Sequence, residues 1–175
     1  MDKNQAIIDY LVQCPKIKDS ALYFNLINAK NDNVQIITRA NDRALSKPYV
    51  DGSILKQYTF TIIVFKSISE NPIIVGTGYE LGTGYTNENV DDLADAQALL
   101  DWVETQQELR NFPNFGDDCY IDEIQTTTEE PRLEGINDEL TPPLAMYSIG
   151  VNVNYIDTSK MIWKENDNDS STIQP

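Results

Sequence analysis

The sequence contains no histidine, only two cysteines and few basic residues. Among its 175 residues, 13 Lys and Arg stand against 28 Asp and Glu, which gives a formal net charge of −15. The absence of His excludes catalytic triads that use His, His proton relays and zinc sites of the HExxH type. The shortage of Lys and Arg argues against a broad basic surface for nucleic acid or anionic membranes, because both partners need their phosphates neutralised.

The two cysteines belong to no recognisable motif. Cys14 and Cys119 lie far apart and show no CxxC or metal-ligand spacing. Two cysteines in a chain of this length make no disulfide framework, so we expect both to be small, half-buried side chains. The N-terminal residues lack a secretory h-region, and no apolar run approaches the ~18 residues of a membrane span. We therefore expect a chain made in the cytoplasm, with no membrane partner.

The remaining composition is that of a globular protein. Hydrophobic residues make up 41% and charged residues 23% of the chain, and the length suits one domain with a substantial core. Residues 164–175 are polar and lack a hydrophobic pattern, so they are predicted to form a disordered acidic tail. The sequence thus predicts a single α+β domain over residues 1–163.

Two segments have the apolar spacing of helices. The first spans about residues 3–13, with Asp2 as its N-cap, Gln5 as the reciprocal partner of a capping box, and Pro15 beyond its end. The second spans residues 90–110 with Asn89 as its cap. Leu93, Ala96, Leu100, Val103 and Gln107 follow the 3-4-3-4 spacing of one helix face, and Leu99, Trp102 and Leu109 widen this mostly apolar stripe enough to pack on a sheet.

Five segments are predicted to be strands, namely residues 21–28, 34–40, 54–67, 119–128 and 144–156. The third and the last alternate apolar and polar residues, which is typical of half-buried strands. The first two are expected to form a hairpin across Asn31-Asp32-Asn33. Residues 41–53 are interpreted as a loop, and residues 129–143 as a long acidic connection. The order α-β-β-β-α-β-β predicts an α+β fold, with one mostly antiparallel sheet of about five strands and two helices packed on one face.

A glycine-rich repeat lies between the third strand and the second helix. Gly76-Thr77-Gly78-Tyr79 is followed by Gly82-Thr83-Gly84-Tyr85. No Lys-Ser/Thr follows, and the glycine spacing is one residue too long for a dinucleotide fingerprint, so no nucleotide cofactor is expected. A mobile hairpin tip or a partner-binding loop is favoured, in which Tyr79 and Tyr85 supply contact area.

Carboxylates are so abundant that no cluster of them is diagnostic. Asp117, Asp118 and Asp122 surround the start of one strand, and four glutamates crowd residues 129–143. Either group has the oxygen ligands that Ca²⁺ or Mg²⁺ prefers, yet no nucleophile or acid pair has a recognisable setting. We therefore assign no catalytic residue, no metal and no cofactor, and expect a protein that is not an enzyme.

The charge is divided unevenly along the chain. Residues 1–66 hold nine Lys and Arg and six Asp and Glu, a net of +3, whereas residues 67–175 hold four and twenty-two, a net of −18. One interpretation is an ordinary solvated acidic surface. The other is a subunit with a mildly basic side and a strongly acidic side, suited to head-to-tail or ring assembly.

Four stretches, together with the element order, resemble the tail-terminator or minor-capsid (head–tail joining) proteins of siphophages that infect Gram-positive bacteria. They are Tyr-Thr-Phe-Thr-Ile-Ile-Val-Phe at 58–65, Asp-Asp-Leu-Ala-Asp-Ala-Gln-Ala-Leu-Leu-Asp-Trp at 91–102, Thr-Thr-Thr-Glu-Glu-Pro-Arg at 126–132, and the strand at 145–155. The resemblance implies a virion structural protein, assembled in the host cytoplasm. Such proteins form a hexameric ring that caps the tail tube and joins it to the head connector or a neck protein. The implied partners are copies of itself, the tail tube protein and that connector, with DNA only passing through the lumen.

Residues of the acidic connection are the candidates for these contacts. Glu129, Glu130, Arg132 and Glu134 are predicted to contact the ring neighbour, the tube or the lumen, with Tyr79 and Tyr85 as further candidates. Arg132 is the only Lys or Arg between Arg110 and Lys160, which suggests an acidic partner for it. Two alternatives remain open: a neck or head-completion protein of the same fold, and an acidic DNA mimic that inhibits a DNA-binding enzyme.

Overall fold

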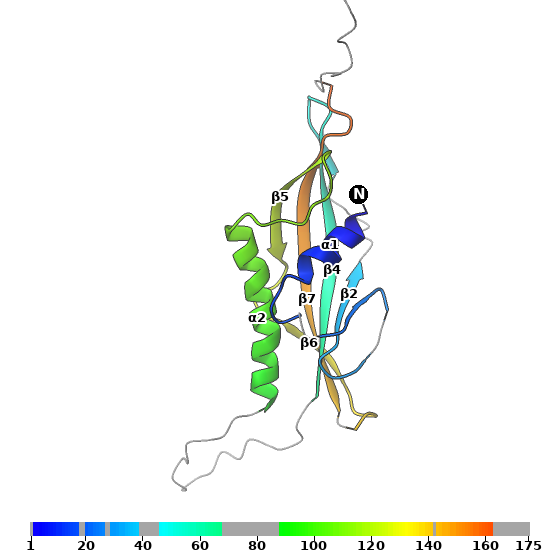
Figure 1. Ribbon diagram of the computed structural model, residues 1–175, viewed down its shortest axis with the longest axis vertical. Helices are drawn as coiled ribbons and strands as arrows, with labels where there is room; N and C mark the ends of the chain where they lie inside the picture. Colours follow the sequence, from blue (N-terminus) through cyan, green and yellow to red (C-terminus); the bar gives the residue numbers. More distant parts are fainter. Residues whose placement is uncertain are drawn as a thin grey trace, which may run out of the picture.

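Two long strands form the centre of the protein (Figure 1). β4 (Ile54–Ser67) and β7 (Leu144–Asp157) pair antiparallel over their whole length of 14 residues. The computed structural model describes residues 2–17, 20–26, 29–38, 46–67, 88–141 and 143–162. The glycine-rich repeat with Tyr79 and Tyr85, and the tail predicted at 164–175, lie outside these residues.

Shorter strands extend this central pair into a sheet of seven strands. On one side of β4 lie β2 (Val34–Thr38), followed by β1 (Leu22–Phe24), and, further along β4, β3 (Ser46–Pro48). On the other side, β5 (Cys119–Thr126) and β6 (Arg132–Asn137) both pair with β7, each along one half of it. The predicted α+β fold with a mostly antiparallel sheet is confirmed, although the sheet has seven strands and not about five.

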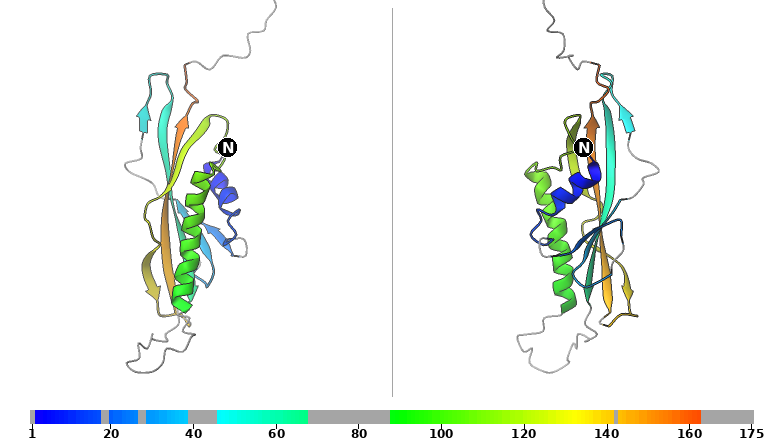
Figure 2. Two further views of the ribbon diagram at one scale, coloured as in Figure 1. Left: turned by 90° about the vertical axis from the view of Figure 1, so that its left-hand side faces the viewer. Right: turned by 45° about the vertical axis from the view of Figure 1, so that its right-hand side comes forward.

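Both helices cover the same face of this sheet (Figure 2). α1 (Lys3–Leu11) and α2 (Glu88–Glu108) pack on one side of the β4–β7 pair, as the sequence predicts. The alternation along β4 and β7 turns one set of side chains toward the helices. The strands give this core Phe60, Ile62, Val64, Ile149, Val151 and Val153, and the helices give it Ala6, Ile7, Tyr10, Leu11, Leu99, Leu100 and Val103.

The helix ends differ in detail from the prediction. Asp2 caps α1 by accepting a hydrogen bond from the Asn4 N–H (2.9 Å), but Gln5 donates its side chain to Asp9 instead of completing a capping box. α2 begins at Glu88, so the predicted cap Asn89 lies inside the helix. The sequence at 86–89 contains several residues that are common helix caps. The pattern alone therefore does not identify the residue at which the helix begins.

The first two strands are parallel, and the predicted hairpin is therefore wrong. Leu22 to Phe24 run alongside Val34 to Ile36 in the same direction. Asn25 ends β1 in the left-handed region (φ 49°), donates its N–H to Ile36 O and accepts from Thr38 N–H with its side chain. These bonds fix the end of β1 against β2, and an apolar run cannot reveal the direction of a strand.

Two of the strands lie in segments that were predicted to be loops. β3 lies within residues 41–53 and β6 within residues 129–143. Each fills a gap, because β2 and β5 are shorter than the central strands and leave part of β4 and of β7 without a neighbour. The exposed side chains of both strands give them no hydrophobic alternation, which is why the sequence did not indicate them.

The opposite face of the sheet is covered by no helix among the residues that the structure describes. Hydrogen-bonded polar side chains run across its upper part: Gln57 donates to Asn154 (3.0 Å), Asn154 donates to Glu123 (3.0 Å), and Thr59 donates to Asn152 (2.9 Å). In this part of the sheet the helix-free face is therefore polar, whereas further along it turns apolar with Ile63, Phe65 and Met146.

Candidate functional site

The division of charge along the sequence becomes a division across the sheet. All strands on one side, β1 to β4, come from residues 22–67, and all strands on the other side, β5 to β7, come from residues 119–157. The boundary between the +3 and −18 parts of the sequence thus lies between the adjacent strands β4 and β7. Among the described strands, those on the first side are basic and those on the second are acidic: β1 to β4 carry Lys47, Lys56 and Lys66 and no Asp or Glu, whereas β5 to β7 carry Asp122, Glu123, Glu134 and Asp157 against Arg132.

Two of the predicted interface residues meet on the helix-free face. Glu134 accepts a hydrogen bond from the Ser148 hydroxyl (2.5 Å), and Arg132 Nε lies 3.9 Å from the same Glu134 oxygen. They border a hollow of about 120 Å³ with Thr61, Thr127 and Gly150. The Arg132 side chain is 74% exposed, so most of its guanidinium faces solvent and is accessible to a partner.

Glu129 and Glu130, which were expected to contact the same partner, do not line this hollow. Glu129 and Glu130 lie in the exposed bend between β5 and β6. Glu129 lines a separate groove, described next, whereas Glu130 lines neither. The four residues therefore do not form one site, because a strand alternates its side chains and the bend turns the chain away.

A groove runs between α2 and β5 on the acidic side. It encloses about 480 Å³ and is lined by carboxylates from α2 (Glu104 and Glu108), from β5 (Glu123) and from the bend after β5 (Glu129). Gln107 Oε1 accepts a hydrogen bond from the Ile124 N–H (2.8 Å), and Glu104 accepts one from the Thr126 hydroxyl (2.9 Å). The sequence pattern does not indicate this groove by itself, although the spacing of Glu104, Gln107 and Glu108 places them on one face of the helix.

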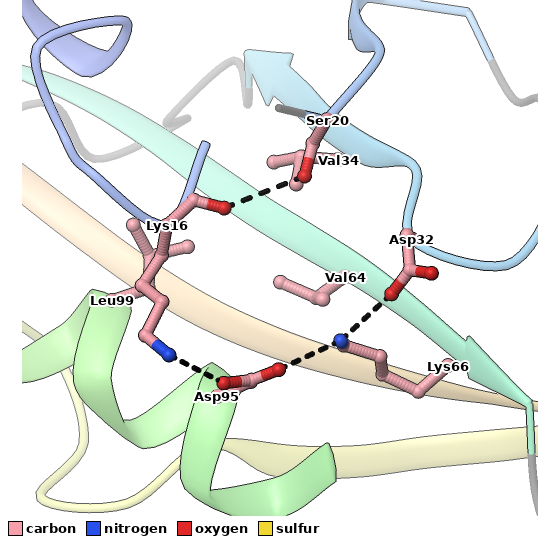
Figure 3. A pocket seen from close by; sticks show the side chains of 8 residues that line it. All are labelled: Lys16, Ser20, Asp32, Val34, Val64, Lys66, Asp95 and Leu99. Carbon is pink, nitrogen blue, oxygen red and sulfur yellow. Dashed lines mark hydrogen bonds and ion pairs between the residues drawn. The ribbon is translucent and has the colours of Figure 1, made fainter. Parts of the chain in front are cut away.

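A chain of ion pairs joins α2, the segment after α1 and the sheet (Figure 3). Asp95 on α2 contacts Lys16 (2.7 Å) and Lys66 (2.9 Å), and Lys66 also contacts Asp32 (2.8 Å). Burial alone would lower the pKa of Lys66, but its hydrogen bonds to Asp32 and Asp95 together raise that pKa above its usual value. The Lys16 and Lys66 ammonium groups hold the pKa of Asp95 below its usual range. This arrangement joins separate segments and presents no reactive group.

The described part of the chain offers few groups for covalent chemistry. No group of three His, Cys, Asp or Glu residues in it is placed to hold a metal ion. Burial raises the pKa of the Cys14 thiol, which disfavours a thiolate, and Cys119 is half-buried.

Two surfaces of the described residues are accessible to a partner. The acidic groove and the Arg132–Glu134 hollow are both open to solvent. No helix in the described ranges is long and apolar enough to cross a membrane. In comparison with known proteins, no family model and no curated protein matches this chain.

Proposed function

We propose that this chain is a structural assembly protein that associates head to tail with copies of itself. The observation that supports this proposal most directly is the separation of charge across the sheet, between the side formed by β1 to β4 and the side formed by β5 to β7. A ring closes only through heterologous contacts, in which one surface of a subunit meets a different surface of the next. Opposite charges on the two sides favour such contacts, while two acidic sides repel each other.

The resemblance noted in the sequence is the basis for proposing a specific role for this assembly. We propose a hexameric tail terminator of a siphophage, which caps the tail tube and joins it to the head connector. Six copies would carry about six times the chain's −15. A lumen lined by such subunits repels the phosphates of DNA, so the genome passes through without being bound. The protein is assembled in the host cytoplasm and ends in the virion.

Light scattering after size exclusion tests the proposed self-assembly. The expected result is a particle of about six times 19.8 kDa, seen as a ring by negative-stain microscopy, either for the chain alone or after addition of purified tail tube protein. A chain that stays monomeric at high concentration, with and without the tube protein, would contradict the proposal. A ring that binds the head connector but not the tube would identify a neck protein instead.

The second candidate function is mimicry of DNA by carboxylates. Its supporting observation is the set of four glutamates around the α2–β5 groove. A mimic of this kind inhibits a DNA-binding enzyme at near-stoichiometric amounts. Inhibition of a nuclease at a ratio near one to one, without ring formation, would favour this candidate over the terminator.

A further inference from the structure

The α2–β5 groove contains an open edge of the sheet. β5 is the terminal strand on its side, with β7 as its neighbour. The Thr127 N–H donates to Gly150 O (2.8 Å) across this pair. Because the bonds of an antiparallel ladder alternate, the backbone N–H and C=O groups of Ile124 and Thr126 point away from β7 and toward the groove. Of these groups, the Ile124 N–H is held by a side chain, that of Gln107.

The short strand β3, which borders β4 beyond β2, carries two residues that oppose strand addition and that β5 lacks. β3 is fully exposed and consists of Ser46, Lys47 and Pro48. An edge Lys and an edge Pro are common devices against strand addition, since proline lacks the N–H donor and lysine resists desolvation. β5, with the sequence Cys-Tyr-Ile-Asp-Glu-Ile-Gln-Thr, contains neither residue, and its bulge between Ile121 and Glu123 comes before the regular pairing of Ile124 to Thr126 with β7.

The charge of the groove defines what can occupy it. Glu104, Glu108, Glu123 and Glu129 line it, and no Lys or Arg of the described residues belongs to its lining. Symmetric pairing with the β5 edge of a second copy would bring two such sets of carboxylates together, which like-charge repulsion disfavours. In an extended strand, every second residue faces the same way at a spacing of roughly 6.8 Å. Basic side chains at alternate positions of an incoming strand would therefore meet the carboxylates repeatedly.

We propose that this groove binds an extended segment of a partner protein that carries Lys or Arg at alternate positions and adds to β5 as a further strand. A backbone carbonyl of the segment replaces Gln107 Oε1 at the Ile124 N–H. Its backbone N–H groups donate to the outward carbonyls of β5, and its cations pair with the glutamates. Main-chain bonds supply affinity and the charges supply selectivity, as in other cases of strand addition. The proposal goes beyond self-assembly, because it concerns a different polypeptide.

Calorimetric titration with a synthetic peptide tests the proposal. The probe is Lys-Thr-Lys-Val-Lys-Val-Lys-Thr-Lys, and the control peptide has proline in place of both valines. The full-length chain is expected to bind the probe at least tenfold more tightly than the proline peptide, because proline removes backbone donors without changing the charge. Equal binding of the two peptides, or no binding of the probe, would overturn the proposal.

A pair of matched protein variants separates the groove from the overall charge. Glu108→Lys with Glu129→Lys alters two exposed residues that line the groove, whereas Glu130→Lys with Glu139→Lys makes the same change in net charge outside it. The first variant is expected to lose at least tenfold in probe affinity, and the second less than about threefold. Equal losses would mean that a basic peptide binds by net charge alone, and the proposal would be wrong.

Two further measurements address the backbone edge itself. Gln107→Ala removes the side chain that competes for the Ile124 N–H, so it is expected to bind the probe more tightly than the unaltered chain does. Hydrogen exchange at the Thr126 amide is expected to slow when the probe is bound. Unchanged exchange at saturation would rule out strand addition. If the groove variant instead abolishes self-association without any peptide, the occupant is a second copy and a separate partner protein is excluded.

Discussion

The hydroxyl groups of two tyrosines are expected to have opposite effects on the stability of the fold. Tyr10 is 1% exposed, packs on Trp102 (5.1 Å between ring centroids), and its hydroxyl has no hydrogen-bond partner within the described residues. A buried hydroxyl without a partner is destabilising. Tyr10→Phe is therefore expected to raise the free energy of unfolding by up to about 1 kcal/mol, as measured by urea denaturation.

The control for this prediction is the second tyrosine, Tyr58. Its hydroxyl donates to Asn4 Oδ1 (2.6 Å), and burial raises its pKa to about 12. Tyr58→Phe is expected to lower the free energy of unfolding by about 1 kcal/mol. A loss of stability of the same size in both variants would show that Tyr10 has a partner as well.

The Asp157 carboxylate predicts a particular dependence of stability on pH. Lys56 donates to it (2.6 Å), and Ser159 donates both its hydroxyl and its N–H, so the pKa of Asp157 lies well below its usual range. A depressed pKa stabilises the fold fully above the unfolded value of about 3.9, and this contribution is lost as the pH falls below it. Asp157→Asn is expected to lower the free energy of unfolding by about 1 kcal/mol at neutral pH, a modest value because the pair lies near solvent.

The same measurement near pH 2.5 is expected to show a smaller difference between Asp157→Asn and the unaltered chain. Asp122→Asn serves as the control, because Asp122 is exposed and its replacement is expected to change little at either pH. A difference for Asp157 that stays constant between the two pH values would contradict the assignment of this ion pair.

At the scale of elements, the side chain of the residue that follows β5 leaves no room for a larger residue at one point of β7. A Cβ added to Gly150 would collide with Thr127 Oγ1. Gly150→Ala is therefore expected to lower the free energy of unfolding by about 1–3 kcal/mol. Thr127 is exposed, so Thr127→Ala alone should be nearly neutral, yet it removes the colliding oxygen. The double variant Gly150→Ala with Thr127→Ala should recover most of the lost stability. If its effect equals the sum of the two single effects, the two residues do not interact and the predicted collision is wrong.

The elements also show where prediction from the sequence stops. β4, β7 and the apolar stripe of α2 could be predicted because each buries one face, and burial produces a periodic pattern. β3 and β6 could not, because they are exposed on both faces and exist only where the long central strands lack a neighbour. Charge alone indicates Arg132 and Glu134 in the sequence, whereas the hydrogen bond between Ser148 and Glu134 depends on the pairing of β6 with β7.

At the scale of the whole molecule, the concentration of charge on one side predicts an effect of salt. The part of the chain from residue 67 onward carries −18, and its carboxylates repel one another in the folded state. Raising NaCl from about 20 to about 200 mM shortens the Debye length and weakens this repulsion. The midpoint of thermal unfolding, followed by circular dichroism, is expected to rise by a few degrees.

The variant with Glu130→Lys and Glu139→Lys provides the matched control for this effect. It has fewer negative charges on the acidic side, so its midpoint should rise less over the same range of salt. A midpoint that falls with salt in the unaltered chain would show that ion pairs such as Lys66–Asp32 and Lys16–Asp95 outweigh the repulsion.

The sequence by itself determined the α+β class, the two helices on one face of a mostly antiparallel sheet, and the unequal charge of its two parts. These properties depend on composition and on periodic burial, which are local. Only the tertiary structure decided that the charge boundary lies between β4 and β7, that β1 runs parallel to β2, and that a groove with an open strand edge lies beside α2. Strand order and pairing bring together residues far apart in the chain, such as Gln107 and Ile124 or Lys56 and Asp157, and no local pattern encodes such contacts.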